Sequence, residues 1–213
     1  MLDKYKETFK TWNKVASLYQ EKFMNLDLYN ETYNYICENL KIDRAKILDV
    51  GCGPGNITKY LLSKRKDFVI LGIDVASNMI ELARKNNPNA RFSIMDARRV
   101  NDLDARFDCI ICGFILPYLS QNDFERFLND SYRLLNHNGL IYLSYVEGDS
   151  INSGYQTGSS VDKVYFYYYS EDFVKSKLAE NNFSDIKTFK VQYKRTETDI
   201  ETHTIMIAIK TMA

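Results

Sequence analysis

Proline, histidine and an excess of either charge are scarce in this sequence of 213 residues. The three prolines (Pro54, Pro88 and Pro117) are too few for a proline-rich linker that would divide the chain into domains. Lys plus Arg and Asp plus Glu both total 28, and without a basic excess nucleic acid is disfavoured as an obligate partner. No apolar run approaches the roughly eighteen residues of a membrane span, so we expect no membrane partner.

Cysteine is also sparse, and its spacing excludes a zinc module. Cys37, Cys52, Cys109 and Cys112 form no pair of C-x-x-C motifs. Cys109 and Cys112 fall in an apolar β-type run, where their side chains point to opposite faces. The first residues alternate charge with aromatics and lack the apolar block of a secretion signal. We therefore expect reduced thiols, no metal and a cytoplasmic protein.

What the chain does contain is an alternation of strand and helix patterns from residue 46 onward. Short β-branched runs predict strands at 47–50, 68–74, 91–95, 107–113 and 140–146. Helical patterns lie at 57–66, 78–86, 123–135 and 170–181. This alternation is typical of parallel strands whose helical crossovers cover both faces of a sheet.

The two ends of the chain predict other structure. Apolar side chains recur at helical spacing from Phe9 to Phe23, and 28–40 is typical of a second helix. Near the other end, long strands at 186–193 and 202–209 are separated by a polar stretch short enough for a hairpin. The last strand should therefore run antiparallel to its neighbour.

The segment from Ile47 to Thr58, ILDVGCGPGNIT, is the most informative. An apolar strand runs into Gly51, Gly53 and Gly55, and a helix follows at once. Glycine permits positive φ and lets a ligand approach the backbone closely. The loop amides and the start of the helix then offer hydrogen-bond donors. The segment predicts a nucleotide-type pocket at the carboxyl end of the first strand.

Two classes of ligand compete for this pocket. A dinucleotide site prefers G-x-G-x-x-G, whereas here the third glycine comes one residue early. Asp74, at the end of the second strand, suits ribose hydroxyls in either class. Asp49 would repel a pyrophosphate and attract an ammonium group, unless it bonds within its own turn. We favour a ligand with adenosine at one end and an amino acid at the other, with an NAD-dependent oxidoreductase as the disfavoured alternative.

At these residues the sequence resembles the class I S-adenosylmethionine-dependent methyltransferases of the small-molecule type. The five matching motifs, in chain order, are 48–55, 72–79, 92–97, 107–114 and 134–143. The resemblance implies a Rossmann-like three-layer α/β/α sandwich with a seven-stranded, mostly parallel sheet, an antiparallel last strand and N-terminal helices. It also implies one methyltransferase domain over 1–213, with a helical cap at 1–42 and an α/β core at 43–213.

The resemblance further implies S-adenosyl-L-methionine as the methyl donor, with its amino-acid arm on the glycine loop. Asp49 would lie near the ammonium group of that arm. The backbone of Gly51, Cys52 and Gly53 would face the rest of it.

The adenosine end would lie on the next two strands. Asp74 would accept from the ribose hydroxyls, while Val75 and Met79 would pack on the adenine. Asp96 would accept from the exocyclic amine, beside the Ala97 amide.

The methyl group would leave near the end of the fourth strand. The resemblance places Gly113 and Phe114 under the sulfonium, and Tyr19 as the aromatic that closes the pocket. Tyr19 also belongs to an aromatic stripe, so a core role is an equal alternative.

Acceptor chemistry is the least defined part of the sequence. His137 lies at the amino edge of the sheet, away from the ligand. His203 opens the last strand at the carboxyl edge, where it could reach an acceptor and act as a base, but we favour a solvated position for it. The stretch from Tyr155 to Tyr169 is either a lid beside the acceptor or a packing segment. We expect in-line transfer to an unidentified small molecule by a monomer or homodimer, with catalytic residues unknown. The alternative is a non-catalytic protein that binds S-adenosylmethionine or S-adenosylhomocysteine.

Overall fold

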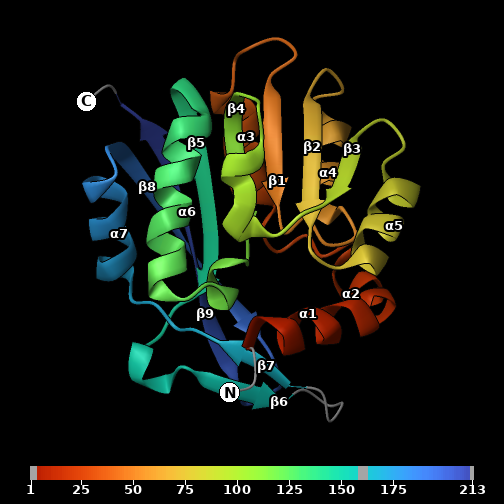
Figure 1. Cartoon of the computed structure of the whole chain (residues 1–213), viewed down its shortest axis with the longest axis vertical. Coiled ribbons are helices and arrows are strands. Elements are labelled where there is room, and N and C mark those ends of the chain that lie inside the picture. Colours follow the sequence, from red (N-terminus) through yellow and green to blue (C-terminus); the bar gives the residue numbers. More distant parts are fainter. Residues whose placement is uncertain (1–3, 158–162, 212–213) are drawn as a thin grey trace.

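A computed structural model describes residues 4–157 and 163–211 of the chain (Figure 1). The main sheet consists of β1 (Lys46–Val50), β2 (Val69–Asp74), β3 (Arg91–Ile94), β4 (Phe107–Gly113), β5 (Leu135–Val146), β8 (Phe183–Lys194) and β9 (Ile200–Lys210). The helices are α1 (Lys4–Lys14), α2 (Ala16–Phe23), α3 (Asn30–Asn39), α4 (Asn56–Lys64), α5 (Ser77–Asn86), α6 (Gln121–Leu134) and α7 (Glu171–Glu180). The 3₁₀ turns are η1 (Ala97–Asp102), η2 (Leu116–Tyr118) and η3 (Ser150–Asn152).

The strands lie in the order β3-β2-β1-β4-β5-β9-β8. From β3 to β5 every pair is parallel, and β9 lies antiparallel between β5 and β8. The predicted sandwich, with its seven-stranded sheet and antiparallel last strand, is confirmed. The strand order reverses between β1 and β4, and ligands of open α/β sheets bind in the crevice outside such a reversal.

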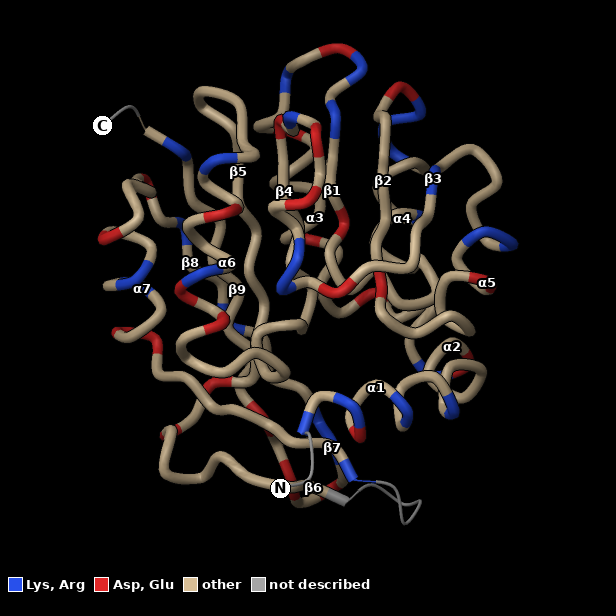
Figure 2. The backbone as a smooth tube through the Cα atoms, viewed as in Figure 1, with Lys and Arg blue, Asp and Glu red and all other residues tan. Residues whose placement is uncertain are grey.

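Both faces of the sheet are buried, which explains its continuous apolar runs. On β4, Cys109 and Ile111 pack into a cluster with side chains of α3 and α4. Ile110 and Cys112 face the opposite cluster, which α6 and α7 cover. The cysteines therefore lie on opposite faces as predicted, and both are free. Both helices that cover this cluster, α6 and α7, carry basic and acidic residues (Figure 2).

The N-terminal region differs from the two helices that the sequence predicted. The apolar stripe is divided at Val15, whose φ of −92° and ψ of 11° end α1 and start α2. The bend turns Trp12 and Tyr19 toward each other, so that their rings meet edge to face at 5.6 Å. A repeat at helical spacing indicates which side chains share a face, but not whether the axis stays straight.

The Tyr-rich segment folds as a two-stranded sheet, β6 (Gly154–Thr157) and β7 (Lys163–Phe166), and residues 158–162 of its loop lie outside the described residues. Thr11 Oγ1 donates to the Lys163 carbonyl at 3.0 Å, and Thr8 Oγ1 accepts from the Tyr165 amide at 3.2 Å. Helix α1 and this sheet together lie beyond the carboxyl ends of the main strands (Figure 1). Among the described residues, no helix has the length and apolar character needed to cross a bilayer.

Candidate active site

The glycine loop after β1 has the conformation that its sequence predicts. Gly51, Gly53 and Gly55 have φ of 66°, 52° and 81°. At Gly51 a Cβ would also come within 2.9 Å of Ile115 Cδ1, so a larger residue would be strained twice over. The loop therefore presents bare backbone at the crevice.

Asp74, at the end of β2, is fastened to this loop. Its carboxylate accepts from the Gly53 amide at 3.0 Å and from the Ala76 amide at 2.8 Å. Burial raises the pKa of Asp74, while these amides oppose the rise. A carboxylate has about four lone-pair sites, so capacity for ligand hydroxyls remains.

Asp49 lies beneath the loop and is 1% exposed. One oxygen accepts from Thr58 Oγ1 at 2.7 Å, whereas Oδ1 has no partner among the described residues. Burial raises the pKa of Asp49 to about 6. A buried acceptor without a donor is rare, and a cationic group of a ligand would supply one.

Two adjoining cavities, of about 100 and 30 Å³, open beside Asp74; we call them the carboxylate cavities. Both contain Gly51, Asp74 and Val75 in their lining. Met79 lines the larger cavity and Asp96 the smaller one. Carboxylates from two neighbouring strands thus meet at one edge of the sheet.

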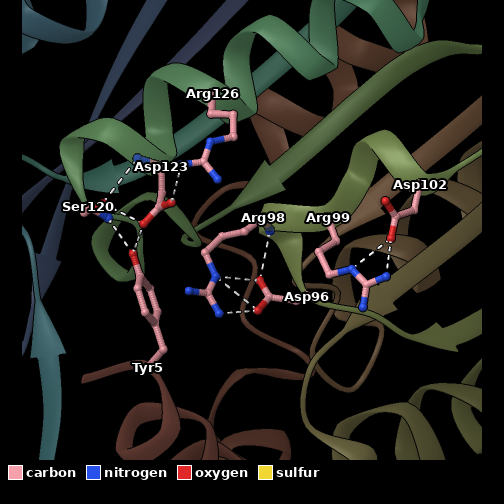
Figure 3. Close-up of polar contacts among 8 residues, drawn as sticks. All are labelled: Tyr5, Asp96, Arg98, Arg99, Asp102, Ser120, Asp123 and Arg126. Atoms are coloured by element: carbon pink, nitrogen blue, oxygen red, sulfur yellow. Dashed lines mark hydrogen bonds and ion pairs between the residues drawn. The ribbon is translucent and has the colours of Figure 1, made fainter. Parts of the chain in front are cut away.

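Asp96 is already engaged by Arg98 (Figure 3). It accepts from the Arg98 amide at 2.9 Å and from the Arg98 guanidinium at 3.1 Å. The guanidinium lies 3.8 Å from the centre of the Tyr5 ring of α1, and the Tyr5 hydroxyl donates to Asp123 at the start of α6. Tyr5 therefore holds helix α1 against the carboxylate cavities through its contacts with Arg98 and Asp123.

A third cavity, of about 180 Å³, continues from the larger carboxylate cavity; we call it the aromatic cavity. The two share Trp12, Tyr19, Gly113, Phe114 and Tyr118. The aromatic cavity is lined by the rings of Trp12, Tyr19, Phe23, Tyr29, Tyr33, Phe114, Tyr118, Phe166 and Tyr193.

Phe114 organises the inner wall of this cavity. Its φ of 55° lies in the left-handed region, which bulky residues avoid. The Phe114 amide donates to Ser144 Oγ at 2.9 Å, and the ring meets His203 edge to face at 4.9 Å. Such backbone strain concentrates at functional sites.

The solvated position expected for His203 is wrong. His203 is 5% exposed and stacks on Tyr193 at 4.9 Å. Its Nδ1 lies 2.7 Å from the Tyr29 hydroxyl, and its Nε2 lies 3.3 Å from Glu201 Oε2. These three polar groups all line the aromatic cavity.

The structure brings the predicted site residues together. All line the three cavities except Gly53, whose amide holds Asp74, and Asp49, which is buried beneath the loop. The sequence analysis did not indicate Tyr29 or Glu201, and it placed His203 at the ligand edge but favoured a solvated side chain. The one signal for them was that a hairpin returns the start of the last strand to the ligand edge. Within 4–157 and 163–211, no three His, Cys, Asp or Glu side chains converge as a metal site requires.

Comparison with known proteins places this geometry in a family. Residues 47–139 match the family described as a methyltransferase domain. The fold matches 1,6-didemethyltoxoflavin-N1-methyltransferase from Burkholderia thailandensis, with a TM-score of 0.72 at 19% identity over 97% of this chain and 88% of that one. It also matches magnesium protoporphyrin IX methyltransferase from Synechocystis, with a TM-score of 0.71 at 16% identity over 99% of both chains. Residues 47–139 therefore belong to the methyltransferase domain family, and the chain has the fold of S-adenosylmethionine-dependent methyltransferases.

Curated relatives match this chain over about half of its length. Malonyl-[acyl-carrier protein] O-methyltransferase from Acetivibrio thermocellus is 34% identical over 52% of this chain and 40% of its own. Demethylmenaquinone methyltransferase from Thermotoga maritima is 29% identical over 49% of this chain and 44% of its own. The chain thus spans less than half the length of these relatives.

The family match divides the candidate site into two parts. The glycine loop, Asp74 and Asp96 fall inside 47–139. The aromatic cavity draws most of its lining from outside that range, including Tyr29, Tyr193 and His203. The carboxylate cavities therefore draw most of their lining from the matched segment, whereas most of the lining of the aromatic cavity lies outside it.

Proposed function

We propose that this chain transfers a methyl group from S-adenosyl-L-methionine to a small-molecule acceptor. The donor would occupy the carboxylate cavities and the acceptor the aromatic cavity. The observation that best supports this proposal is the pair of hydrogen bonds by which the Gly53 and Ala76 amides fix Asp74. They hold a carboxylate, which can only accept hydrogen bonds, where ribose hydroxyls can donate to it.

The polar groups of the site fit that donor. The unpartnered Asp49 Oδ1 would take the ammonium group, beside the backbone of Gly51, Cys52 and Gly53. Trp12 Nε1 is a buried N–H without a partner among the described residues, and Trp12 lines two of the cavities. An unpaired donor and an unpaired acceptor around one site suit a ligand that carries both kinds of group.

At the adenosine end, Asp74 would hold the ribose, with Val75 and Met79 packing on the adenine. Asp96 and the Ala97 amide would meet its polar edge. Asp96 accepts from both the amide and the guanidinium of Arg98, and these hydrogen bonds fix the orientation of its carboxylate.

The chain's contribution to the reaction is alignment and the exclusion of water. The bound donor supplies a methyl group already activated by the positive charge on its sulfur. Gly113 and Phe114 lie where the carboxylate and aromatic cavities meet, and they would position the reacting groups. Tyr19 lines both cavities and would close them from α2.

Isothermal titration with S-adenosylhomocysteine tests the donor site. Asp74→Asn should weaken binding by about 1–3 kcal/mol, because it removes the charged acceptor and leaves one oxygen for two amides that each bind a different carboxylate oxygen. Asp67→Asn makes the same change in charge at an exposed residue that pairs with Arg65, and should leave the affinity unchanged.

The reaction itself requires turnover of isotopically labelled donor against metabolite extracts. Label should move into a small-molecule fraction at a rate that Asp74→Asn reduces. Binding of NAD without binding of S-adenosylhomocysteine would overturn the proposal. Tight binding of S-adenosylhomocysteine without turnover in any extract would favour the non-catalytic alternative.

A further inference from the structure

His203 is buried in the wall of the aromatic cavity although it lies near the start of β9, next to an exposed hairpin. The β5–β9 register pairs it with Val146, at the carboxyl end of β5. The rings of Tyr193 and Phe114 pack on it at 4.9 Å each. The sheet therefore places an imidazole in the aromatic cavity, and most of the lining of that cavity lies outside the matched segment 47–139.

The contacts of His203 fix its tautomer. Glu201 Oε2 can only accept, so Nε2 carries the hydrogen, and the lone pair of Nδ1 is left to accept from the Tyr29 hydroxyl. Burial lowers the pKa of His203, and burial raises the pKa of Tyr29. At neutral pH the pair is therefore a neutral phenol donating to a neutral imidazole.

Other titratable and charged groups also surround this pair. Arg195, on the β8–β9 hairpin, lies 3.3 Å from the Glu201 carboxylate. Tyr193 of β8 stacks on the imidazole, and the Lys22 ammonium of α2 lies 5.8 Å from the centre of the Tyr193 ring. Glu201 is the negative charge nearest to His203, so a proton gained by the imidazole would be stabilised there.

We propose that Tyr29, His203 and Glu201 form a proton relay that deprotonates the methyl acceptor, and that the acceptor is an uncharged aromatic or heteroaromatic ring bearing an O–H or N–H group. This inference rests on the proposed function. The acceptor oxygen or nitrogen forms its bond to the methyl carbon as the carbon–sulfur bond breaks, and that electron pair stays on sulfur as a neutral thioether. The acceptor proton passes to the Tyr29 oxygen, the Tyr29 proton passes to His203 Nδ1, and water later removes it from the imidazolium.

The lining of the cavity selects the acceptor class. Its rings offer stacking and edge-to-face contacts to another flat ring. Of the described residues that line it, only Glu201 carries a formal charge, and that charge is negative. A carboxylate or phosphate on the acceptor would lose water without gaining a cationic side chain from the lining, so the lining disfavours such acceptors.

Histidine NMR tests the relay without a known acceptor. The chain has two histidines, and exposed His137 serves as the internal reference. With ¹⁵N-labelled histidine and bound S-adenosylhomocysteine, His203 should be neutral at pH 7 with its hydrogen on Nε2, and Glu201→Gln should lower its pKa further. An imidazolium at pH 7, or a hydrogen on Nδ1 in the wild type, refutes the relay.

Turnover with labelled donor tests the acceptor class and the role of each relay residue. The panel contains simple phenols and azoles, the same rings carrying a carboxylate, and an alkylamine. Only the uncharged rings should be methylated. Tyr29→Phe and His203→Asn should lower kcat by about 10²–10⁴, with S-adenosylhomocysteine affinity unchanged. Glu201→Gln should shift the acidic limb of the kcat/KM pH profile toward lower pH, because His203 then stays neutral to a lower pH.

His137→Asn is the matched control and should leave kcat unchanged. If His203→Asn fails to fold, His203→Gln takes its place. Unchanged kcat in folded Tyr29→Phe and His203→Asn overturns the relay. The acceptor class is overturned if the carboxylated rings or the amine are methylated instead of the uncharged rings. It is also overturned if a protein that binds S-adenosylhomocysteine methylates nothing in the panel. If the wild-type protein did not bind S-adenosylhomocysteine, the proposed function would be refuted instead.

Discussion

At the scale of single residues, the site is defined by polar groups that the fold buries without satisfying. Asp49 Oδ1 and Trp12 Nε1 both lack a partner among the described residues. Asp49 is the more costly of the two, because burial disfavours its charged form and raises its pKa to about 6. Such a carboxylate is poised to gain from a cationic ligand.

The affinity for S-adenosylhomocysteine should therefore depend on pH through Asp49. In the free protein the carboxyl is protonated below about pH 6 and ionised above it. An ammonium group prefers the ionised form, so affinity should rise about tenfold from pH 5 to pH 7 as Asp49 ionises. Titration calorimetry across this range, corrected for buffer ionisation, measures the effect.

Asp49→Asn is the control, because it keeps Thr58, His203 and His137 while removing the titration. Its affinity should be flat between pH 5 and pH 7. A slope that survives in this variant assigns the dependence to another group, and a flat wild type removes Asp49 from the ammonium site.

How well the sequence predicts a residue depends on how local its environment is. The roles proposed for Gly51 and Asp74 follow from a loop and a strand end within one β–α–β unit, and the structure places both at the cavities. The burial of His203 depends on Tyr29, Phe114 and Tyr193, which are distant in sequence. No spacing rule connects those rings, so the sequence alone suggested a solvated histidine.

At the scale of elements, α1 is the cover of the carboxylate cavities. It is joined to α6 through Tyr5, which donates to Asp123 and accepts from the Ser120 amide at 3.1 Å (Figure 3). It is joined to β7 through Thr8 and Thr11. Aromatic periodicity predicted a helix in this region, but these contacts depend on elements far along the chain and could not be derived from it.

Tyr5→Phe should loosen this cover while keeping the ring against Arg98. Loss of the hydroxyl removes about 1 kcal/mol from the docking of α1. Amide hydrogen exchange over Lys4–Lys14 should then be roughly fivefold faster, and S-adenosylhomocysteine should dissociate faster.

Tyr60→Phe is the comparison variant, since the Tyr60 hydroxyl donates to Asn34 between α4 and α3, away from α1. It should leave exchange over Lys4–Lys14 unchanged. Equal acceleration in both variants would mean a general loss of stability rather than release of the cover.

At the scale of the whole molecule, the sheet and the elements beyond its carboxyl edge have separate origins in the sequence. The alternating strands and helices of 47–139 carry the glycine loop, Asp74 and Asp96. These elements could be predicted because hydrophobic periodicity and turn residues are local signals in the sequence. The aromatic cavity forms only when α1, α2, β7 and the β8–β9 hairpin converge on that edge. These elements come together only through tertiary packing. The sequence pattern indicated the individual helices and strands, but not where they contact one another.

This division predicts how the molecule responds to its ligand. At S-adenosylhomocysteine concentrations of 100 times Kd, binding should add about 2.7 kcal/mol to the free energy of unfolding. Hydrogen exchange should slow most in α1, α2 and the glycine loop, because both helices line the cavities and can open locally. Helix α7, which contributes nothing to the lining of the three cavities, is the internal control, and its exchange should slow only by as much as global unfolding is suppressed. Mass spectrometry of exchanged peptides resolves these regions, and slowing confined to the glycine loop and β2 would mean that the N-terminal helices do not close on the ligand.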